Sequence, residues 1–368
     1  NRVMGVAARR LQSITLFRAC RRVWVDTGLT FSGGCLETSE EKQTEDLPIG
    51  GQAVIEGVMM RVDKRIVTAV RTADGQIVVH EEEHEPWNRR LGLHRIPVAR
   101  GAVAFLEMMI IGLRTLNLSA DVAMQSERRE RGLAPELEAP SRWKDRLALG
   151  ATLAVSLALG IGVFFFLPLA AAQATGAAKG ALQFNLMAGA VRTTLLIGYM
   201  WGIGHWSDIR RVFEYHGAEH KSIFTMEAGA ELTVDEARAF GRLHPRCGTS
   251  FLLIVVLLSI FVFALVDTAF VDVFGHAQSL IERFLTHMSV LPLISGLSFE
   301  LLKLSGRKRN HPVTRVLIKP GLWLQRITTK EPADDQIEVA LVALRVALGQ
   351  ETAVEYAPWA QWRRSLAT

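Results

Sequence analysis

The chain contains four apolar stretches, each long enough to cross a lipid bilayer as a helix: 147–172, 184–206, 251–274 and 284–304. An α-helix rises about 1.5 Å per residue, so about 20 apolar residues cross the hydrocarbon core. Apolar residues make up 49% of the 368 residues and charged residues only 21%. The sequence therefore predicts a mainly α-helical, polytopic membrane protein with about four transmembrane helices.

Basic residues between these stretches predict the orientation, because lysine and arginine resist transfer across a membrane. The two short loops carry one basic residue each, Lys179 and Arg283. The middle loop carries six: Arg210, Arg211, Lys221, Arg238, Arg242 and Arg246. We therefore expect the middle loop and both termini in the cytosol.

Isolated charged residues interrupt the stretches, and a lone charge is costly in lipid. Arg192 is expected to extend toward the membrane surface or to pair with Asp267. Glu300 lies at the inner end of the fourth stretch and shares a helix face with Lys303, three residues on. An ion pair with Lys303 is therefore its favoured role.

The region before the first stretch divides into three parts. Residues 1–46 are rich in arginine and poor in acids, which favours a disordered leader, either a targeting peptide or unrelated upstream sequence. Residues 47–100 are punctuated by glycine and predict a small β-rich subdomain, with a hairpin at Asp74-Gly75. Residues 101–145 predict an interfacial helix and a polar linker.

The rest of the chain forms the predicted membrane core and a tail. Residues 146–305 predict a four-helix core, interrupted by a cytosolic, histidine-rich loop at 207–249. Residues 306–368 predict a cytosolic tail with one helix, whose first turn contains Pro332 and Asp334. Its apolar face should dock on the cytosolic domain or on the bilayer.

The middle loop contains the chain's most specific chemical pattern, His216-Gly-Ala-Glu-His220. On a helix, His216 and His220 lie one turn apart and project from the same face. Two imidazoles at that spacing can bind one divalent metal ion, with zinc the expected ion, and Glu219 beside them can act as a catalytic base.

A second pair, His244 and Cys247, directly precedes the third apolar stretch. The loop leaves and re-enters the same membrane face, so the helices can bring both pairs together. We therefore predict His216, His220, His244 and Cys247 as metal ligands. Glu56, the one acid of a glycine-rich segment expected to fold over the cluster, and Glu300 are weaker ligand candidates.

Each assignment has a structural alternative. The two histidines of the first pair would also suit a solvated basic patch with Arg211 and Lys221, and Cys247 would suit a small buried residue in a proline turn. Three scattered cysteines make no disulfide framework. The net charge is only +5 and no basic face is interleaved with aromatics, which argues against nucleic-acid binding.

Four long motifs resemble those of the YqhQ-like proteins of bacteria: Gly50-Gly-Gln-Ala-Val-Ile-Glu-Gly-Val-Met-Met-Arg61, Tyr215-His-Gly-Ala-Glu-His-Lys221, His244-Pro-Arg-Cys-Gly-Thr-Ser-Phe251 and Leu322-Trp-Leu-Gln-Arg-Ile-Thr-Thr-Lys-Glu-Pro332. The resemblance covers residues 48–345, whereas 1–46 and 350–368 depart from the pattern. Those proteins are uncharacterised integral membrane proteins described as predicted metal-dependent enzymes. The resemblance thus implies a metal-dependent protein of the bacterial inner membrane, with no assigned substrate; an organellar membrane is the alternative.

Two functions follow from these patterns. In the first, zinc held by three protein ligands leaves a coordination position open, as in a membrane-embedded hydrolase. In the second, all four ligands close the site, and the metal stabilises a non-catalytic scaffold or transport accessory protein. Membrane lipid is the expected partner in both. The substrate and the oligomeric state do not follow from the sequence.

Overall fold

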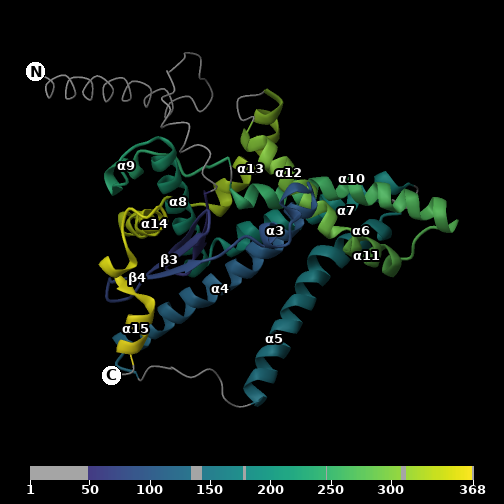
Figure 1. Cartoon of the computed structure of the whole chain (residues 1–368). Coiled ribbons are helices and arrows are strands. Elements are labelled where there is room, and N and C mark those ends of the chain that lie inside the picture. Colours follow the sequence, from purple (N-terminus) through teal and green to yellow (C-terminus); the bar gives the residue numbers. More distant parts are fainter. Residues whose placement is uncertain (1–48, 134–142, 177–179, 246, 308–311, 367–368) are drawn as a thin grey trace, which may run out of the picture.

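A computed structural model describes residues 49–133, 143–176, 180–245, 247–307 and 312–366. Apolar helices gather into a bundle, and a small β-sheet with its covering helices lies at one end of it (Figure 1). The predicted leader, with Cys20 and Cys35, lies outside the described residues. The helices are α3 (Trp87–Arg90), η1 (Leu93–Arg95), α4 (Ala99–Glu130), α5 (Trp143–Ile161), η2 (Gly162–Phe166), α6 (Leu167–Ala174), α7 (Ala181–Ile203), α8 (Ser207–Glu227), α9 (Val234–Arg238), α10 (Gly248–Phe274), α11 (Leu280–Ser289), α12 (Leu291–Arg307), α13 (Pro312–Thr328), α14 (Asp334–Ala347), η4 (Ala353–Glu355) and α15 (Trp359–Ser365).

The sheet has the order β1-β2-β3-β4-β5 and is antiparallel except for the parallel pair of β4 and β5. The strands are β1 (Ile49–Val54), β2 (Gly57–Val62), β3 (Arg65–Arg71), β4 (Ile77–Glu83) and β5 (Ala357–Pro358). The predicted hairpin is confirmed, because β3 and β4 meet at a turn in which Gly75 has a φ of +86°. The sequence does not predict β5, which comes from the C-terminal tail.

Helices cover both faces of the sheet, because successive strand residues point to opposite sides. Val58 and Met60 of β2 pack in one cluster with Leu341 of α14. Met59, between them, packs on the other face against Ile111 of α4. The predicted tail helix therefore docks on the sheet. It also packs against α8, the helix that carries the histidine motif. This contact holds α8 next to β1 and β2.

Four described helices are long and apolar enough to cross a membrane: Ala99–Glu130, Gly150–Ala174, Ala181–Ile203 and Gly248–Phe274. The last three coincide with predicted stretches. A further candidate is the pair formed by α11 and α12, which is bent by 46°. The protein is thus mainly helical, with apolar helices suited to a membrane and a small N-terminal sheet.

One expected apolar helix is broken, and another, expected to be interfacial, is longer than an interfacial helix requires. The fourth apolar stretch is broken rather than continuous, because α12 starts at Leu291 with Pro292 in its first turn, and proline lacks the N–H that would continue the helix. The expected interfacial helix is the 32-residue α4, itself a candidate span. Its side chains are inverted for an aqueous helix: Glu107 is buried, whereas Leu106 and Leu113 are exposed.

The isolated charges in the bundle also pair differently from the prediction. Asp267 contacts Arg283 and His287 of α11, with distances of 3.3 and 2.9 Å. Arg192 contacts no carboxylate among the described residues. The bend between α11 and α12 accounts for the difference, because it turns α11 back onto α10 and brings a nearer cation to Asp267.

Candidate metal centre

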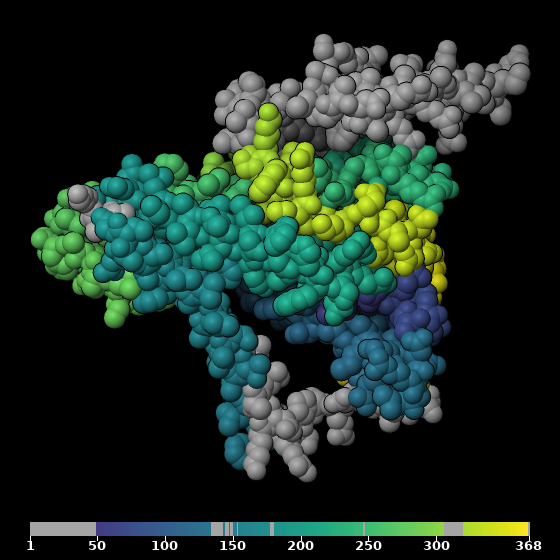
Figure 2. Space-filling view, turned by 180° about the vertical axis from the view of Figure 1, so that it is seen from behind, coloured from purple at the N-terminus to yellow at the C-terminus, as the bar shows by residue number. Residues whose placement is uncertain are grey.

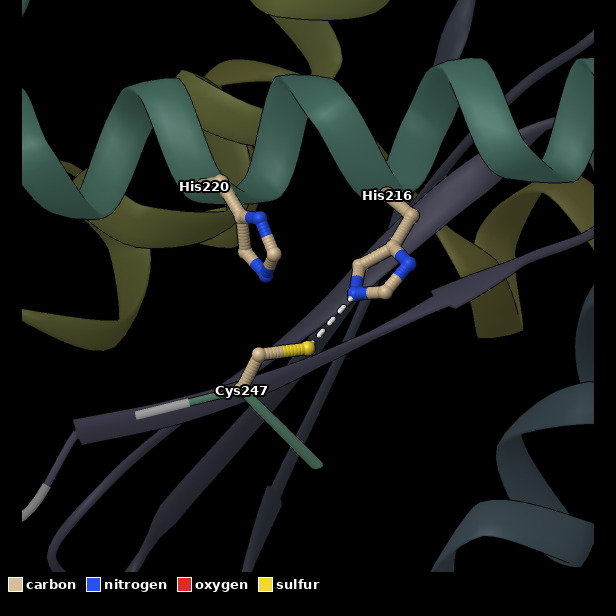
Figure 3. Close-up of side chains that lie close together, drawn as sticks. All are labelled: His216, His220 and Cys247. Atoms are coloured by element: carbon tan, nitrogen blue, oxygen red, sulfur yellow. Dashed lines mark hydrogen bonds between the residues drawn. The ribbon is translucent and has the colours of Figure 1, made fainter. Parts of the chain in front are cut away.

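Three side chains converge where α8 meets the start of α10. His216 and His220 lie one turn apart on α8, and their ring centroids are 4.5 Å apart. Cys247 caps the N-terminus of α10, and its sulfur faces both rings (Figure 3). One ligand atom from each residue lies within 4.8 Å of the other two. The structure therefore brings together three of the four predicted principal ligands.

Backbone carbonyls fix the orientation of both imidazoles. His216 donates through Nδ1 to the carbonyl of Thr328 over 2.9 Å, and His220 donates through Nδ1 to the carbonyl of Arg242 over 2.5 Å. A carbonyl only accepts, so each ring carries its proton on Nδ1 and keeps a lone pair on Nε2. The Nε2 of His216 lies 3.1 Å from the sulfur of Cys247.

The surroundings of Cys247 favour its thiolate. Burial raises the pKa of the Cys247 thiol, but the neighbouring His220 and Thr249 outweigh burial, so that the pKa lies below its usual value. The Thr249 N–H donates to the sulfur over 3.4 Å, at the positive N-terminal end of α10. The thiolate is the form of cysteine that binds metal ions.

The connection between α13 and α14 completes the site around His216. A Cβ on Gly217 would lie 2.1 Å from the carbonyl oxygen of Lys330, so glycine lets this connection pack directly on α8. The Lys330 N–H also donates to the carbonyl of Phe213 over 2.8 Å. This packing places the Thr328 carbonyl beside His216. Both residues lie in the motif 322–332, but nothing in that motif predicts a contact with His216.

Gln325 of α13 is a second residue that sequence reasoning missed. Its Oε1 accepts from the backbone N–H of His244 over 2.7 Å, and its Nε2 donates to the His244 carbonyl over 2.8 Å and to Ser250 over 3.2 Å. The side chain is fully buried. It clamps the turn that presents Cys247. A polar residue in the buried face of an apolar helix is the signal that would have identified it.

Glu219 lies on α8 beside the three ligands and is buried against β1. A Cβ on Gly51 would lie 2.7 Å from its Oε1, so glycine makes room for this carboxyl. Burial raises the pKa of Glu219 to about 8. A carboxyl with a pKa near neutrality is suited to take up and release a proton.

His244 lies next to the three-residue group but outside it. Its ring centroid is 5.6 Å from that of His220 and 4.4 Å from that of Phe224. Its Nε2 lies 3.5 Å from a carboxylate oxygen of Glu227. The geometry therefore directs His244 toward Glu227, behind His220.

The two weaker ligand candidates also lie outside the group. Glu56 does fold onto α8, but its carboxylate pairs with Arg211 and accepts from the Tyr215 hydroxyl over 3.4 Å. Glu300 pairs with Arg100, whose Nε donates to Oε1 over 2.6 Å, and so links α12 to α4. The described residues thus offer His216, His220 and Cys247 as one ligand set.

This ligand set fits a zinc ion. Imidazole nitrogen and thiolate sulfur are the ligands that zinc prefers. Burial lowers the pKa of His220 and so favours the neutral imidazole, whose lone pair a metal requires. Histidines that bind metal usually donate their other ring N–H to a carbonyl or carboxylate, as both do here.

Comparisons with known proteins agree with the motifs. A family model described as "Protein of unknown function (DUF1385)" matches residues 96–350. The "Uncharacterized protein YqhQ" of Bacillus subtilis (strain 168) is 35% identical over 322 residues, which cover 83% of this chain and 94% of that protein. No solved structure matches the chain.

Proposed function

We propose that this chain, which belongs to the DUF1385 family of YqhQ-like proteins, is a metal-dependent, hydrolase-like enzyme of a bacterial inner membrane. In this proposal, His216, His220 and Cys247 hold one divalent ion, zinc being the expected one. The observation that carries it is the convergence of three ligand atoms within 4.8 Å, with both imidazoles fixed through Nδ1. A basic patch exposed to solvent would not require such fixed orientations.

The number of ligands favours an enzyme over a closed structural site. Structural zinc sites have four protein ligands, whereas catalytic sites have three and keep one position open. Here the fourth predicted ligand, His244, faces Glu227 instead. A zinc ion bound by the three residues would supply Lewis-acid chemistry, polarising a bound oxygen and lowering the pKa of water.

Glu219 would act as the proton acceptor. It lies three residues after His216 on α8, so both side chains project from the same face of the helix. With a pKa of about 8, the buried carboxyl can exchange a proton near neutral pH. Its role is therefore to take a proton from the attacking group and return it to the leaving group.

The position of the site limits its substrates. Cys247 directly precedes α10, a candidate span, so the cluster lies at the end of an apolar helix. With the middle loop and both termini inside, as the basic residues predict, this end faces the cytosol. Lipid head groups of the inner leaflet and cytosolic proteins are then the available substrates.

The alternative function is a metal-stabilised scaffold or transport accessory protein. One observation favours it: the His244 ring lies 5.6 Å from the His220 ring, so a turn of the His244 side chain would offer a fourth ligand. A site with four protein ligands has no open position for a substrate.

Metal analysis of purified, untagged protein tests the proposal. The wild type should contain about one zinc per chain, and a His216→Ala/His220→Ala variant less than about one tenth of that, because two ligands are lost. A His205→Ala/His276→Ala variant is the matched control, since both of its histidines are exposed. Equal zinc in the wild type and the His216/His220 variant would refute the proposal.

A further inference from the structure

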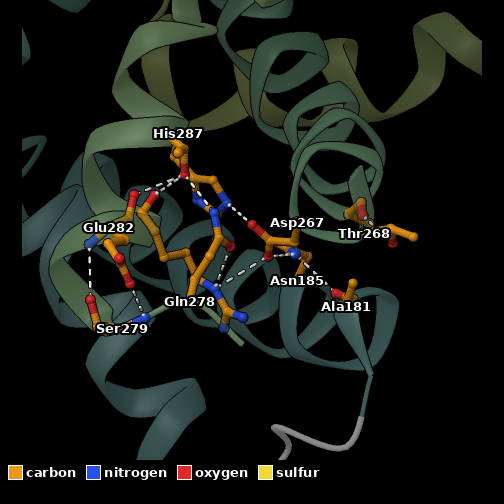
Figure 4. A network of polar contacts seen from close by, with 11 residues as sticks. Ala181, Asn185, Asp267, Thr268, Gln278, Ser279, Glu282 and His287 are labelled. Atoms are coloured by element: carbon orange, nitrogen blue, oxygen red, sulfur yellow. Dashed lines mark hydrogen bonds and ion pairs between the residues drawn. The ribbon is translucent and has the colours of Figure 1, made fainter. Parts of the chain in front are cut away.

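A second polar cluster lies within the bundle, far from the metal centre (Figure 4). Its central residue is Asp267 of α10, which lies about 30 Å beyond Cys247 at about 1.5 Å per helical residue. Asp267 is 1% exposed and has three partners. They are Asn185 at 2.7 Å, His287 at 2.9 Å and Arg283 at 3.3 Å. The carboxylate is therefore neutralised by Arg283 and fully hydrogen-bonded.

Arg192 lies near this cluster without a carboxylate of its own. It occupies the middle of α7 and is 6% exposed. Its Nε donates to the carbonyl of Phe164 over 3.1 Å and its Nη1 to the hydroxyl of Ser259 over 3.2 Å. Its guanidinium carbon lies 5.1 Å from the ring centroid of Phe165 and 5.4 Å from that of Phe263. All of these contacts are with neutral groups, although a guanidinium has five N–H donors.

His287 has an unused nitrogen beside the same aromatic ring. It stacks on Phe263 with centroids 3.8 Å apart and an interplanar angle of 2°. Its Nε2 bonds to Asp267, while its buried Nδ1 has no hydrogen-bond partner among the described residues. A buried polar atom without a partner is costly, and native proteins rarely keep one without a function. Phe263 thus has Arg192 and His287 as neighbours, each with unused hydrogen-bonding capacity.

The charges of this region do not balance. Two guanidinium groups, of Arg192 and Arg283, face one carboxylate, of Asp267. The π-helical turn η2 and helix α6, which pack against α7, contain no charged residue. The other acid near α11, Glu282, is exposed and caps Ser279. Among the described residues of this region, one positive charge therefore remains without a counter-charge in an apolar bundle, where an uncompensated charge is costly.

We propose that Arg192 and His287 form an intramembrane binding site for a singly charged oxyanion, a carboxylate or a phosphate group. The guanidinium supplies the opposite charge and a planar fork of donors, which suits carboxylate and phosphate. Because Nε2 of His287 donates to Asp267, its Nδ1 keeps a lone pair, which can accept a hydrogen bond from a hydroxyl group of the anionic ligand, such as the P–OH of a phosphate. Ion-pairing residues inside membrane spans commonly mark substrate pathways. The site does not depend on the metal centre.

The course of α5 leaves the turn η2, which covers the buried Arg192, open to lateral approach. The turn η2, Gly162–Phe166, is π-helical, and its Phe164 carbonyl is the one that accepts from Arg192. Before this turn, α5 leaves the bundle and makes its main contacts only with η2 (Figures 1 and 2). Its residues Val155 and Leu159 are exposed. An amphiphile in the bilayer can therefore reach the turn from the side.

Thermal unfolding of the full chain in nanodiscs of zwitterionic lipid tests this site. The anionic probes are oleate, dioleoylphosphatidylglycerol and inorganic phosphate. Oleyl alcohol is the control without net charge for oleate, and dioleoylphosphatidylcholine is the one for dioleoylphosphatidylglycerol. At about 100 times the dissociation constant, an anionic probe should raise the Tm by roughly 3–5 °C. A response to the amphiphiles alone identifies a lipid-borne anion, and a response to phosphate as well identifies a small soluble one.

Three variants decide whether Arg192 carries the effect. Arg192→Gln should abolish the shift, and His287→Gln should reduce it at least about threefold. Arg131→Gln, which changes the exposed arginine that directly follows α4, should leave it intact. If Arg192→Gln does not fold, Arg192→Lys is compared with the wild type instead. This variant keeps the positive charge but loses the planar fork of donors. An equal shift in every variant, or an equal response to the uncharged probes, would overturn the proposal, and zinc content should not change in any of them.

Discussion

The histidines of the candidate metal centre and the histidine of the polar cluster around Asp267 are held by different partners. His216 and His220 donate through Nδ1 to backbone carbonyls, and each keeps Nε2 as a lone pair beside a sulfur. His287 instead uses Nε2 to bond to the carboxylate of Asp267 and keeps Nδ1. A neutral acceptor fixes a neutral imidazole, which suits a cation. At His287 the lone pair remains on Nδ1, and the positive charge that suits an anion is that of Arg192.

The two regions also differ in how they offset the cost of burial. In the metal centre, neutral partners orient the ligands, and Gly51 and Gly217 let backbone and carboxyl approach closely. In the polar cluster around Asp267, the ion pair with Arg283 compensates the charge of the Asp267 carboxylate. The first arrangement concentrates acceptor atoms at one point, whereas the second leaves one guanidinium in excess. This difference leads us to expect opposite ligands at the two sites.

The largest expected effect concerns the ion pair between Asp267 and Arg283. Replacing Asp267 by Ala leaves Arg283, whose side chain is only 13% exposed, without its carboxylate, which should lower the free energy of unfolding by roughly 3–5 kcal/mol. Asp267→Asn keeps the shape and one hydrogen bond to Asn185 and should lower it less. Unfolding followed by denaturant titration in detergent measures both. A loss under about 1 kcal/mol for Asp267→Ala would show that the cluster is solvated rather than buried.

An intermediate effect is expected where a hydrogen-bonded clamp supports the metal ligands. Gln325→Ala removes the bonds that hold the turn before Cys247, so the affinity for zinc should fall by roughly 10- to 100-fold, as for other residues that orient ligands. Competition with a chelator of known affinity measures this change. Gln350→Ala, at an exposed position, is the control. An unchanged affinity would mean that Cys247 does not depend on the clamp.

The smallest expected effect separates three ligands from four. His244→Ala removes a ring that faces Glu227, so zinc affinity should change by less than about threefold if the site has three protein ligands. The same chelator competition applies. A fall of more than about 100-fold would make His244 a fourth ligand and favour the scaffold over the enzyme.

Local sequence signals predicted those features that depend on neighbours along the chain. The hairpin at Asp74-Gly75 follows from turn chemistry, and the shared face of His216 and His220 follows from the helical period. The apolar length of α7 and α10 predicted two candidate spans. Each of these signals lies within a few residues and needs no tertiary information.

Contacts between distant segments were not predictable in the same way. Thr328 meets His216 from 112 residues away through a backbone carbonyl, which any residue type would offer. Arg100 and Glu300 pair across 200 residues, whereas the local rule favoured Lys303. Side-chain periodicity carries no information about which helices meet, so partners of isolated charges follow only from the fold.

The most direct test of the metal centre is zinc K-edge X-ray absorption of the purified, untagged protein. The proposed site predicts one sulfur at about 2.3 Å and two imidazole nitrogens at about 2.0–2.1 Å, with one further light atom in the open position. The sulfur contribution should vanish in Cys247→Ser. A zinc site surrounded only by nitrogen and oxygen in the wild type, or protein purified without bound zinc, would contradict it.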